Sequence, residues 1–340
     1  HLTTRRQRQM CIRDSLKDVS GNCRMTRVTL LAGGVGGAKL AEGLAGIPEI
    51  TLTVIGNVAD DEEFHGLWVS PDIDTMLYTL SGRVNRDQGW GLADESNRAL
   101  EMLNCLGADT WMFLGDRDFG LHIYRTERLR RGDRPSDILT DIASKFGINS
   151  KIVLPTDARV QTRVLTDGGW LSFQEYFVRE RCQPEVLELK YDGLELSKIT
   201  VEAELALNEA ELIIIAPSNP LVSILPILKI PGFYATLQNA TAPIFAVSPL
   251  IAGKALKGPA DRMLTSLNYR ADAVGIARFY ENIAAHFLMD SSDFELSDEV
   301  FKLGMQAHTT DIFMPDLAGK VRLAHEILEL HKNVNRLDQK

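Results

Sequence analysis

Acidic residues gather at two positions of the chain where a divalent cation could bind. Asp60 and Asp61 follow an apolar run that ends at Asn57, and Asp72 and Asp74 begin a segment with helical periodicity. Carboxylates held close together repel one another unless a cation lies among them. Hard cations such as Mg²⁺ bind carboxylate oxygens and bridge them to phosphate oxygens. The spacing therefore favours phosphoryl-transfer chemistry.

Each acidic pair also has a simpler explanation. Asp72 and Asp74, in a first helical turn, can interact with the helix dipole without binding any ligand. The acidic run at residues 60–63 can be a solvated loop, and we expect Glu62 and Glu63 to be exposed in either case. The sequence alone leaves both explanations open.

A glycine-rich turn precedes these acids, between an apolar run and a helical segment. Residues without Cβ atoms at a helix N-terminus let backbone N–H groups approach an anion, and the helix dipole favours negative charge there. The alternatives are that the glycines serve only strand–helix packing and that the nearby lysine is solvated. We assign the following residues to an anion site: Gly33, Gly34, Gly36, Gly37 and Lys39.

Two loops farther along the chain also carry small polar or basic residues after apolar runs. In the first loop, the prolines at positions 217 and 220 fix the backbone around two polar residues, and such a loop suits a nucleotide. The second has two lysines within four positions, which either contact an anion or are solvated. If the apolar runs are strands of one parallel sheet, these loops meet at its carboxyl edge. We assign these residues to the same ligand site: Asn57, Ser218, Asn219, Ser248 and Lys254.

Hydrophobic periodicity predicts the elements that would position these residues. Residues 27–32 and 50–57 are strand-like runs separated by a helical segment, and 212–216 and 244–248 are further buried strands. Glycine-terminated helices are expected at residues 74–81, 94–106, 119–131 and 136–146. We predict an α/β fold, a doubly wound, mostly parallel Rossmann-like sheet with a small helical inserted domain.

The predicted domains follow from this pattern. Residues 26–71 and 149–340 form the Rossmann-like nucleotide-binding domain, and residues 72–148 form the helical insertion. Residues 160–166 and 170–178 alternate in polarity on either side of a glycine turn, so we expect them to add an antiparallel pair to the sheet.

Residues 1–25 are excluded from this organisation. They are basic and aperiodic, and residues 5–15 look like a translated sequencing adapter, so Met25 is the expected initiator. We expect a disordered, non-native tail. The alternative is a genuine basic arm.

Composition limits the classes of partner. The chain of 340 residues is 45% hydrophobic and 24% charged, and its formal net charge of -9 argues against nucleic acid or an anionic membrane as a partner. It lacks a run of about 18 apolar residues, a secretory signal and a cysteine pattern typical of disulfides. We expect a cytoplasmic protein that acts on small molecules, with no nucleic-acid or membrane partner.

Several short blocks in fixed order resemble the 2-phospho-L-lactate transferase and phosphoenolpyruvate transferase family of coenzyme F-420 biosynthesis. The resemblance extends from about residue 26 to the C-terminus, through residues 33–40, 57–61, 70–81, 89–91, 114–118, 173–177, 217–231 and 248–260. It implies Mg²⁺-dependent transfer of a phosphoenolpyruvyl or 2-phospholactyl group from a GDP-linked donor to the ribityl hydroxyl of 7,8-didemethyl-8-hydroxy-5-deazariboflavin, with release of GMP. The glycine turn looks more like the bacterial form of the family, which favours the phosphoenolpyruvyl donor.

The resemblance also implies roles for the candidate residues. The four glycines, Ser218 and Asn219 resemble the pocket for guanosine diphosphate, and Asp74 resembles a position that contacts the deazaflavin and the metal. We expect Asp60, Asp61 and Asp74 to bind Mg²⁺, and Asp74 or Asp61 to act in catalysis by accepting the hydroxyl proton.

A flat aromatic acceptor needs aromatic faces and polar groups around it. Trp68, Trp90 and His65 are candidates for its pocket, although each could equally pack in the core or in a lid. Phe113 departs from the family pattern, because some archaeal members carry a lysine there.

Two other functions fit parts of the sequence. A related group, the gluconeogenesis factors, binds UDP-sugars with the same type of fold and acts as a non-enzymatic regulator, but residues 70–75 differ from its motif. A nicotinamide dehydrogenase would need an acidic residue that closes the second strand in the ribose-binding position. Base rates favour a homodimer.

Overall fold

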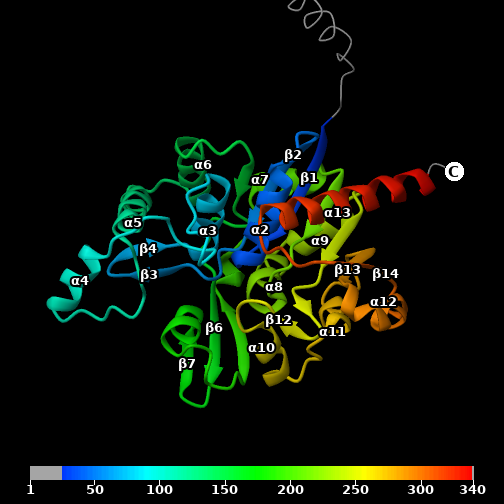
Figure 1. Cartoon of the computed structure of the whole chain (residues 1–340). Helices are drawn as coiled ribbons and strands as arrows, with labels where there is room; N and C mark the ends of the chain where they lie inside the picture. Colours follow the sequence, from blue (N-terminus) through cyan, green and yellow to red (C-terminus); the bar gives the residue numbers. More distant parts are fainter. Residues whose placement is uncertain (1–24, 339–340) are drawn as a thin grey trace, which may run out of the picture.

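A parallel sheet of seven strands forms the centre of the structure, a computed structural model that describes residues 25–338 (Figure 1). Every neighbouring pair of strands in it is parallel. In spatial order the strands are β14 (Gln306–Thr310), β13 (His286–Asp290), β10 (Ile244–Val247), β9 (Leu212–Ile215), β1 (Thr26–Ala32), β2 (Ile50–Gly56) and β5 (Lys151–Val153). The predicted α/β Rossmann-like fold is confirmed. The prediction for the N-terminal tail falls on residues outside the described range, apart from Met25.

The central strands bury side chains on both faces of the sheet. In β1, Leu30 belongs to one hydrophobic core and Leu31 to the other, and in β9 the same alternation separates Ile214 from Ile213. Strands covered on both faces are apolar at most positions, which explains the nearly continuous apolar runs. One core includes residues of α2 (Gly34–Ala45), α3 (Pro71–Leu80), α6 (Pro135–Lys145) and α13 (Leu317–Asp338). The other includes residues of α7 (Val201–Asn208), η3 (Pro220–Ile224), α8 (Leu225–Leu228), α9 (Phe233–Asn239), α10 (Ala260–Ser266), α11 (Ala273–Arg278) and α12 (Ser297–Lys302).

Four helices lie between β2 and β5, as predicted, with shifted ends. Besides α3 and α6 these are α4 (Arg98–Cys105) and α5 (Asp116–Arg130). The helices α4 and α5 pack with a hairpin of β3 (Glu62–Phe64) and β4 (Leu67–Val69) around a small cluster that includes Phe64, Leu100 and Phe119. Residues of α3 and α6 belong to the same hydrophobic core as residues of the sheet. The division into two domains stays a prediction.

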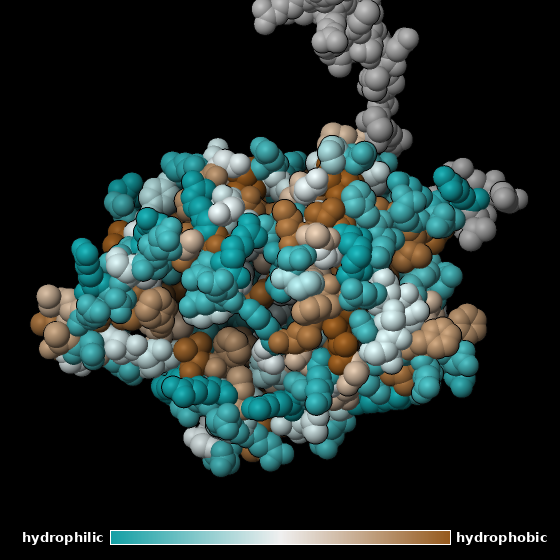
Figure 2. Space-filling model, in the orientation of Figure 1, coloured by the Kyte–Doolittle hydropathy of each residue, from teal (hydrophilic) through white to brown (hydrophobic). Residues whose placement is uncertain are grey.

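The hairpin and α4 project from the rest of the molecule (Figure 1). Figure 2 shows hydrophilic and apolar residues interspersed over this face, with apolar colour at the projecting end; Met102 in α4 and Leu106 just after it are exposed. Glu63 is exposed as expected, but Glu62 is half-buried, because the acidic run continues into β3 and not into a solvated loop.

The expected antiparallel addition to the main sheet is wrong. β6 (Gln161–Thr166) pairs with β7 (Gly169–Ser172) across the predicted turn, but its other neighbour is β8 (Glu188–Asp192), and the three form a separate sheet. Alternating polarity identifies a strand but not its partner, since it says nothing about hydrogen bonding at the strand edge. The remaining elements are η1 (Glu175–Arg179), η2 (Leu194–Leu196), β11 (Leu250–Ile251), β12 (Lys254–Ala255) and η4 (Ser291–Leu296).

The order of the strands reverses at β1. From β1 the chain continues to β2 and β5 on one side, and later elements add β9, β10, β13 and β14 on the other. In open α/β sheets, ligands bind outside the carboxyl ends of the strands at such a switch point. The crevice is therefore expected beside Gly33 and Pro217, which follow β1 and β9. In the part of the chain described, no single helix is long and apolar enough to cross a membrane, and only Pro220–Leu228 with Phe233–Asn239, bent by 82°, reaches that length and composition as a pair.

Candidate functional site

The glycine turn and the loop after β9 meet at the switch point. Gly33 is the N-cap of α2 and has an extended backbone. The Ser218 hydroxyl accepts a hydrogen bond from the Gly33 N–H at 3.3 Å and donates one to the Gly33 carbonyl oxygen at 2.7 Å. These contacts join β1 to β9 where a ligand would bind, and they place Ser218 beside the predicted anion site.

The glycines are required by close approaches of two kinds. A Cβ on Gly36 would lie 2.2 Å from the Pro217 carbonyl oxygen, so this glycine allows α2 to pack against the neighbouring loop. A Cβ on Gly33 would lie 2.6 Å from Oδ2 of Asp72, one of the aspartates of the candidate site. Gly34 has a φ of +61°, a conformation that favours glycine. Glycine is therefore needed in this turn both for helix packing, at Gly36, and for the close approach of a carboxylate, at Gly33.

The start of α2 offers backbone donors. The N-cap residue, Gly33, has no side chain with which to cap this helix, and the N–H groups of a first helical turn have no acceptor within the helix. The Asp72 carboxylate accepts a hydrogen bond from the Gly34 N–H. The remaining donors of the turn are available to an anion.

Replacing Gly33 with alanine should disrupt the approach of α3 to the glycine turn. The new methyl group would overlap Asp72 and also lie 2.7 Å from Cβ of Ser223, so one of these neighbours must move. We expect a loss of about 1–3 kcal/mol in unfolding free energy, as for other overpacked sites, and a larger relative loss of nucleotide affinity. Urea unfolding and GDP titration would measure both. Gly168→Ala, whose Cβ would meet only Thr166 Oγ1 at 3.6 Å, is the matched control, and equal effects in the two variants would contradict the explanation.

The four predicted aspartates converge and are all buried. Asp60, Asp61, Asp72 and Asp74 are between 4% and 9% exposed. The first two lie in the loop from β2 to β3, and the other two in the first turn of α3. Apolar residues on the same helix, including Ile73 and Leu77, insert into the core and hold this turn in place.

Asn57 connects two of these carboxylates. Its Nδ2 donates to Oδ2 of Asp72 at 2.9 Å and to the Val222 carbonyl oxygen at 3.2 Å, while its Oδ1 accepts from the Ala59 N–H at 3.0 Å. The pKa of Asp72 is raised to about 6 by burial, against the stabilising hydrogen bonds from Asn57 and Gly34. The pKa of Asp60 is raised well above its usual value by burial and by the charge of Asp72, and a hydrogen bond from Asn57 opposes this.

Two carboxylate oxygens in this cluster lack a hydrogen-bond partner. Oδ2 of Asp61 accepts from the Ser70 hydroxyl at 2.7 Å and from Nε1 of Trp68 at 3.2 Å, but Oδ1 of Asp61 and Oδ1 of Asp60 are buried and unpaired. Burial raises the pKa of Asp61 to about 8. A small cavity of about 40 Å³ lies beside Asp61, and its volume is comparable to that of a water molecule.

Asp74 is held differently, by a buried arginine on α5. Nη1 of Arg125 donates to Oδ2 of Asp74 at 3.0 Å, and Nη2 donates to Oδ1. Burial would lower the pKa of Arg125, but the Asp74 carboxylate outweighs burial and raises it. Nδ1 of His122 lies 3.8 Å from Oδ2 of Asp74, and burial lowers the pKa of this histidine to about 4, so the ring is neutral at pH 7. Asp74 is therefore paired with a permanent charge.

The unpaired oxygens of Asp60 and Asp61 are better candidates for magnesium ligands than the hydrogen-bonded oxygens of the other aspartates in the cluster. Over the described residues, no three histidine, cysteine or acidic side chains converge as a ligand set. Mg²⁺ is commonly bound by one or two carboxylates together with water and substrate phosphates. Asp60 and Asp61 meet that requirement, whereas both oxygens of Asp74 are bonded to Arg125.

Two predicted lysines lie outside this cluster of contacts. Nζ of Lys39 donates to the Met314 carbonyl oxygen at 2.8 Å, and its pKa is lowered by burial and by the nearby Lys257 and Lys320. Lys254 is exposed in the short hairpin of β11 and β12. Nζ of Lys257 donates to the carbonyl oxygen of Gln88 at 2.6 Å.

Two predicted polar residues stabilise their own loops. Asn219 caps η3, because its side chain accepts from the Leu221 N–H at 3.0 Å. The Ser248 hydroxyl bonds to the N–H and carbonyl of Leu250, at 3.1 Å each. Their roles in binding a ligand stay predictions.

The aromatic candidates lie in different places. Trp68 contacts Asp61, and the Arg159 guanidinium lies 4.9 Å from its ring centroid. Trp90 is exposed, and a Cβ on the preceding Gly89 would lie 3.2 Å from Val35 in the glycine turn. His65 lies in the turn of the β3–β4 hairpin with a φ of +52°.

Arg125, His122 and Ser70 are the site residues that sequence reasoning did not select. Arg125 lies in a helix with several other arginines, and nothing in the sequence marks one of them as buried. The available signal was charge balance, because four converging aspartates need a cationic partner. Ser70 precedes α3, where a serine usually caps the helix, but its hydroxyl donates to Asp61 instead.

The chain is similar in sequence to a known protein family. Residues 28–316 match the family described as 2-phospho-L-lactate transferase CofD. A phosphoenolpyruvate transferase of Streptomyces griseus is 35% identical over 91% of this chain and 99% of its own length. A 2-phospho-L-lactate transferase of Methanococcoides burtonii is 34% identical over 90% of this chain and 99% of its own length.

The fold is also found in solved structures. A Bacillus halodurans protein, described as a member of the UPF0052 family, superposes with a TM-score of 0.58 at 14% identity over 89% of this chain and 99% of its own. At that identity the likeness concerns the fold alone. The family match spans most of the chain, including the glycine turn, the aspartates and the β9 loop. The chain therefore belongs to the 2-phospho-L-lactate transferase CofD family and is a transferase of that type.

Proposed function

We propose that this transferase moves a phosphoenolpyruvyl group from a GDP-linked donor to the ribityl hydroxyl of the deazaflavin 7,8-didemethyl-8-hydroxy-5-deazariboflavin, and releases GMP. The observation that carries the proposal is the pair of buried, unpaired carboxylate oxygens of Asp60 and Asp61 at the crevice where α2 begins without an N-cap side chain. Relatives named for phosphoenolpyruvate and for 2-phospholactate match the chain almost equally. The bacterial character of the glycine turn supports the phosphoenolpyruvyl donor.

The cation required by such a reaction would bind to Asp60 and Asp61. When bound, Mg²⁺ supplies positive charge to the phosphate oxygens of the donor. Oδ1 of each aspartate is the free ligand atom, because Oδ2 of Asp61 is occupied by Ser70 and Trp68.

The glycine turn would bind the nucleotide part of the donor. The open N–H groups of α2 and its dipole stabilise the negative charge that grows on the departing GMP. The Ser218–Gly33 contacts fix these donors before the ligand arrives, so less reorganisation is needed during the reaction.

Asp74 would orient the acceptor. The hydrogen bonds from Arg125 fix its carboxylate in position, and a carboxylate oxygen can accept a hydrogen bond from the attacking hydroxyl. Trp68, which is held against Asp61, offers an aromatic face at the same site. Positioning of the two substrates would provide much of the rate enhancement.

The test is a reconstituted reaction with purified protein, the deazaflavin and either GDP-linked donor, with and without Mg²⁺. We expect GMP and a phosphorylated deazaflavin by liquid chromatography and mass spectrometry, faster with the phosphoenolpyruvyl donor, and none after the metal is removed with EDTA. A faster reaction with the phospholactyl donor would show that the transferred group is 2-phospholactyl and not phosphoenolpyruvyl. Binding of UDP-sugars without any transfer from either donor would instead favour the regulator alternative.

A further inference from the structure

A second cavity, of about 640 Å³, lies between α5, α6 and the loop that follows α3. None of the four aspartates lines it. Ile142 lines both this cavity and the small one beside Asp61, so the two cavities adjoin at this residue, and they share no other lining residue in the described part of the chain. The volume of the larger cavity is within the range of pockets that bind small organic molecules.

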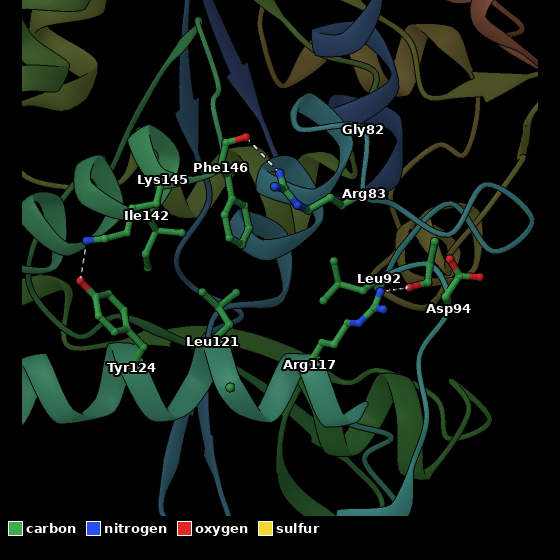
Figure 3. A pocket seen from close by; sticks show the side chains of 12 residues that line it. Gly82, Arg83, Leu92, Asp94, Arg117, Leu121, Tyr124, Ile142, Lys145 and Phe146 are labelled. Atoms are coloured by element: carbon green, nitrogen blue, oxygen red, sulfur yellow. Dashed lines mark hydrogen bonds between the residues drawn. The ribbon is translucent and has the colours of Figure 1, made fainter.

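The walls of the cavity are apolar in the middle and cationic at the ends (Figure 3). Leu121 and Ile142 lie between two groups of polar side chains, and Leu92 lies between the two arginines. Arg83 and Arg117 are at one end, and Lys145 with Tyr124 are at the other. Lys145 is neutralised by Asp141, with which it forms a salt bridge. The positive end of the cavity is therefore the end with the two arginines.

The two arginines have no carboxylate partner among the described residues. Nη1 of Arg83 donates to the Phe146 carbonyl oxygen at 3.0 Å, and its guanidinium lies 4.6 Å from the centroid of the Phe146 ring. Nη1 of Arg117 donates to the Ala93 carbonyl oxygen at 3.1 Å. Asp94 also lines the cavity but forms no salt bridge with either of them. Both arginines are exposed, and backbone carbonyl oxygens orient their guanidinium groups beside an apolar surface, with Asp94 at the same end of the cavity (Figure 3).

Gly120, an exposed residue of α5, shapes the wall of the cavity. It lies inside a helix of 15 residues, where glycine is less favourable than alanine. A Cβ on Gly120 would meet no heavy atom within 4 Å, so the folded chain does not require glycine at this position. Its missing side chain instead leaves the wall of the cavity open at the helix backbone.

We propose that this cavity binds a small organic anion with a flat apolar body, whose carboxylate or phosphate pairs with Arg83 and Arg117. Arginine binds such groups through two parallel hydrogen bonds. The apolar body would lie against Leu92, Leu121 and the backbone at Gly120. The site is separate from the proposed transfer chemistry.

Titration calorimetry with 2-naphthoate, compared with the uncharged 2-naphthamide, tests the proposal on the full chain. We expect naphthoate to bind at least about tenfold more tightly than the amide, the factor expected from charge-assisted hydrogen bonds. Arg83→Gln/Arg117→Gln should weaken naphthoate by at least about tenfold, and Gly120→Leu, which fills the cavity, should weaken both probes. Arg278→Gln, an exposed arginine on α11, is the matched control and should change nothing.

Saturating GDP with Mg²⁺ should leave the naphthoate affinity within about twofold, which separates this site from the proposed nucleotide site whether or not transfer is observed. Circular dichroism of each variant establishes that it is folded. No binding by the wild-type chain, equal affinity for both probes, unchanged affinity in the folded double-arginine variant, or competition by GDP would each overturn the proposal.

Discussion

Replacing Asp61 with asparagine should lower the transfer rate by about a thousandfold and, at the same time, stabilise the metal-free protein at pH 8. The loss of rate follows if Asp61 holds the cation, because metal-based charge stabilisation amounts to several kcal/mol and about 1.4 kcal/mol is a factor of ten. The gain in stability has a separate cause. Oδ1 of Asp61 is buried without a partner, and ionising this group costs free energy.

The pH dependence follows from the pKa of Asp61, which burial raises to about 8 in the folded protein. In the unfolded chain an aspartate has a pKa of about 3.9. The folded state therefore holds a proton that the unfolded state has released, and stability falls as the pH rises from about 4 to about 8. Asparagine cannot ionise, so it removes the part of this decline that comes from Asp61.

Urea unfolding in EDTA at pH 5 and pH 8, together with turnover in Mg²⁺, measures both effects. We expect the stability difference between variant and wild type to grow by at least about 1 kcal/mol between the two pH values. Asp167→Asn, at an exposed turn, is the control and should alter neither quantity. A variant that loses stability equally at both pH values would show that Asp61 is not buried as a neutral acid.

Replacing Arg125 with methionine should cost about 3–5 kcal/mol of unfolding free energy at pH 7, because it leaves the charge of Asp74 buried without a partner. The side chains of Arg125 and Asp74 are 8% and 6% exposed. Asp74→Asn alone should also destabilise, since it leaves the guanidinium uncompensated. The double variant should recover more than half of the loss, because neither charge remains.

A double-mutant cycle from urea unfolding measures the coupling between the two residues. Arg134→Met is the matched control, because Arg134 pairs with Asp157 and Glu202 but its side chain is 48% exposed, and exposed pairs contribute about 0–1 kcal/mol. A loss below about 1 kcal/mol for Arg125→Met, or a double variant no more stable than the single ones, would contradict the buried ion pair.

The sequence predicted the central βαβ unit well because local pattern and tertiary environment agree there. The runs that became β9 and β10 are apolar at every position, and those that became β1 and β2 are mainly apolar with a few threonines and Arg27, as suits strands covered on both faces. In the main sheet, β13 and β14 were not predicted. β13 begins with His286 and ends with Asp290, and the edge strand β14 is largely polar, so neither shows an uninterrupted apolar run.

The candidate site was predictable where chemistry is local and unpredictable where it depends on packing. The aspartates after β2 and at the start of α3 could be found, because their positions at element ends suffice. That Arg125 neutralises Asp74 depends on how α5 docks against α3, and no spacing within either helix reveals that. The same applies to Gly33, whose need for a missing Cβ comes from Asp72 across the crevice.

The pairing of β1 with β9 has a consequence for how the protein is made. β1 lies near the start of the described chain, yet its neighbour in the sheet, with Leu212 opposite Val28, comes much later. Domains form in order as the chain leaves the ribosome, but this β1–β9 contact cannot form until Leu212–Ile215 has been synthesised. A nascent chain that has emerged only as far as α6 already displays all four aspartates and has no partner for the Gly33 backbone. During translation, the four aspartates therefore emerge before the β9 loop that completes the candidate site.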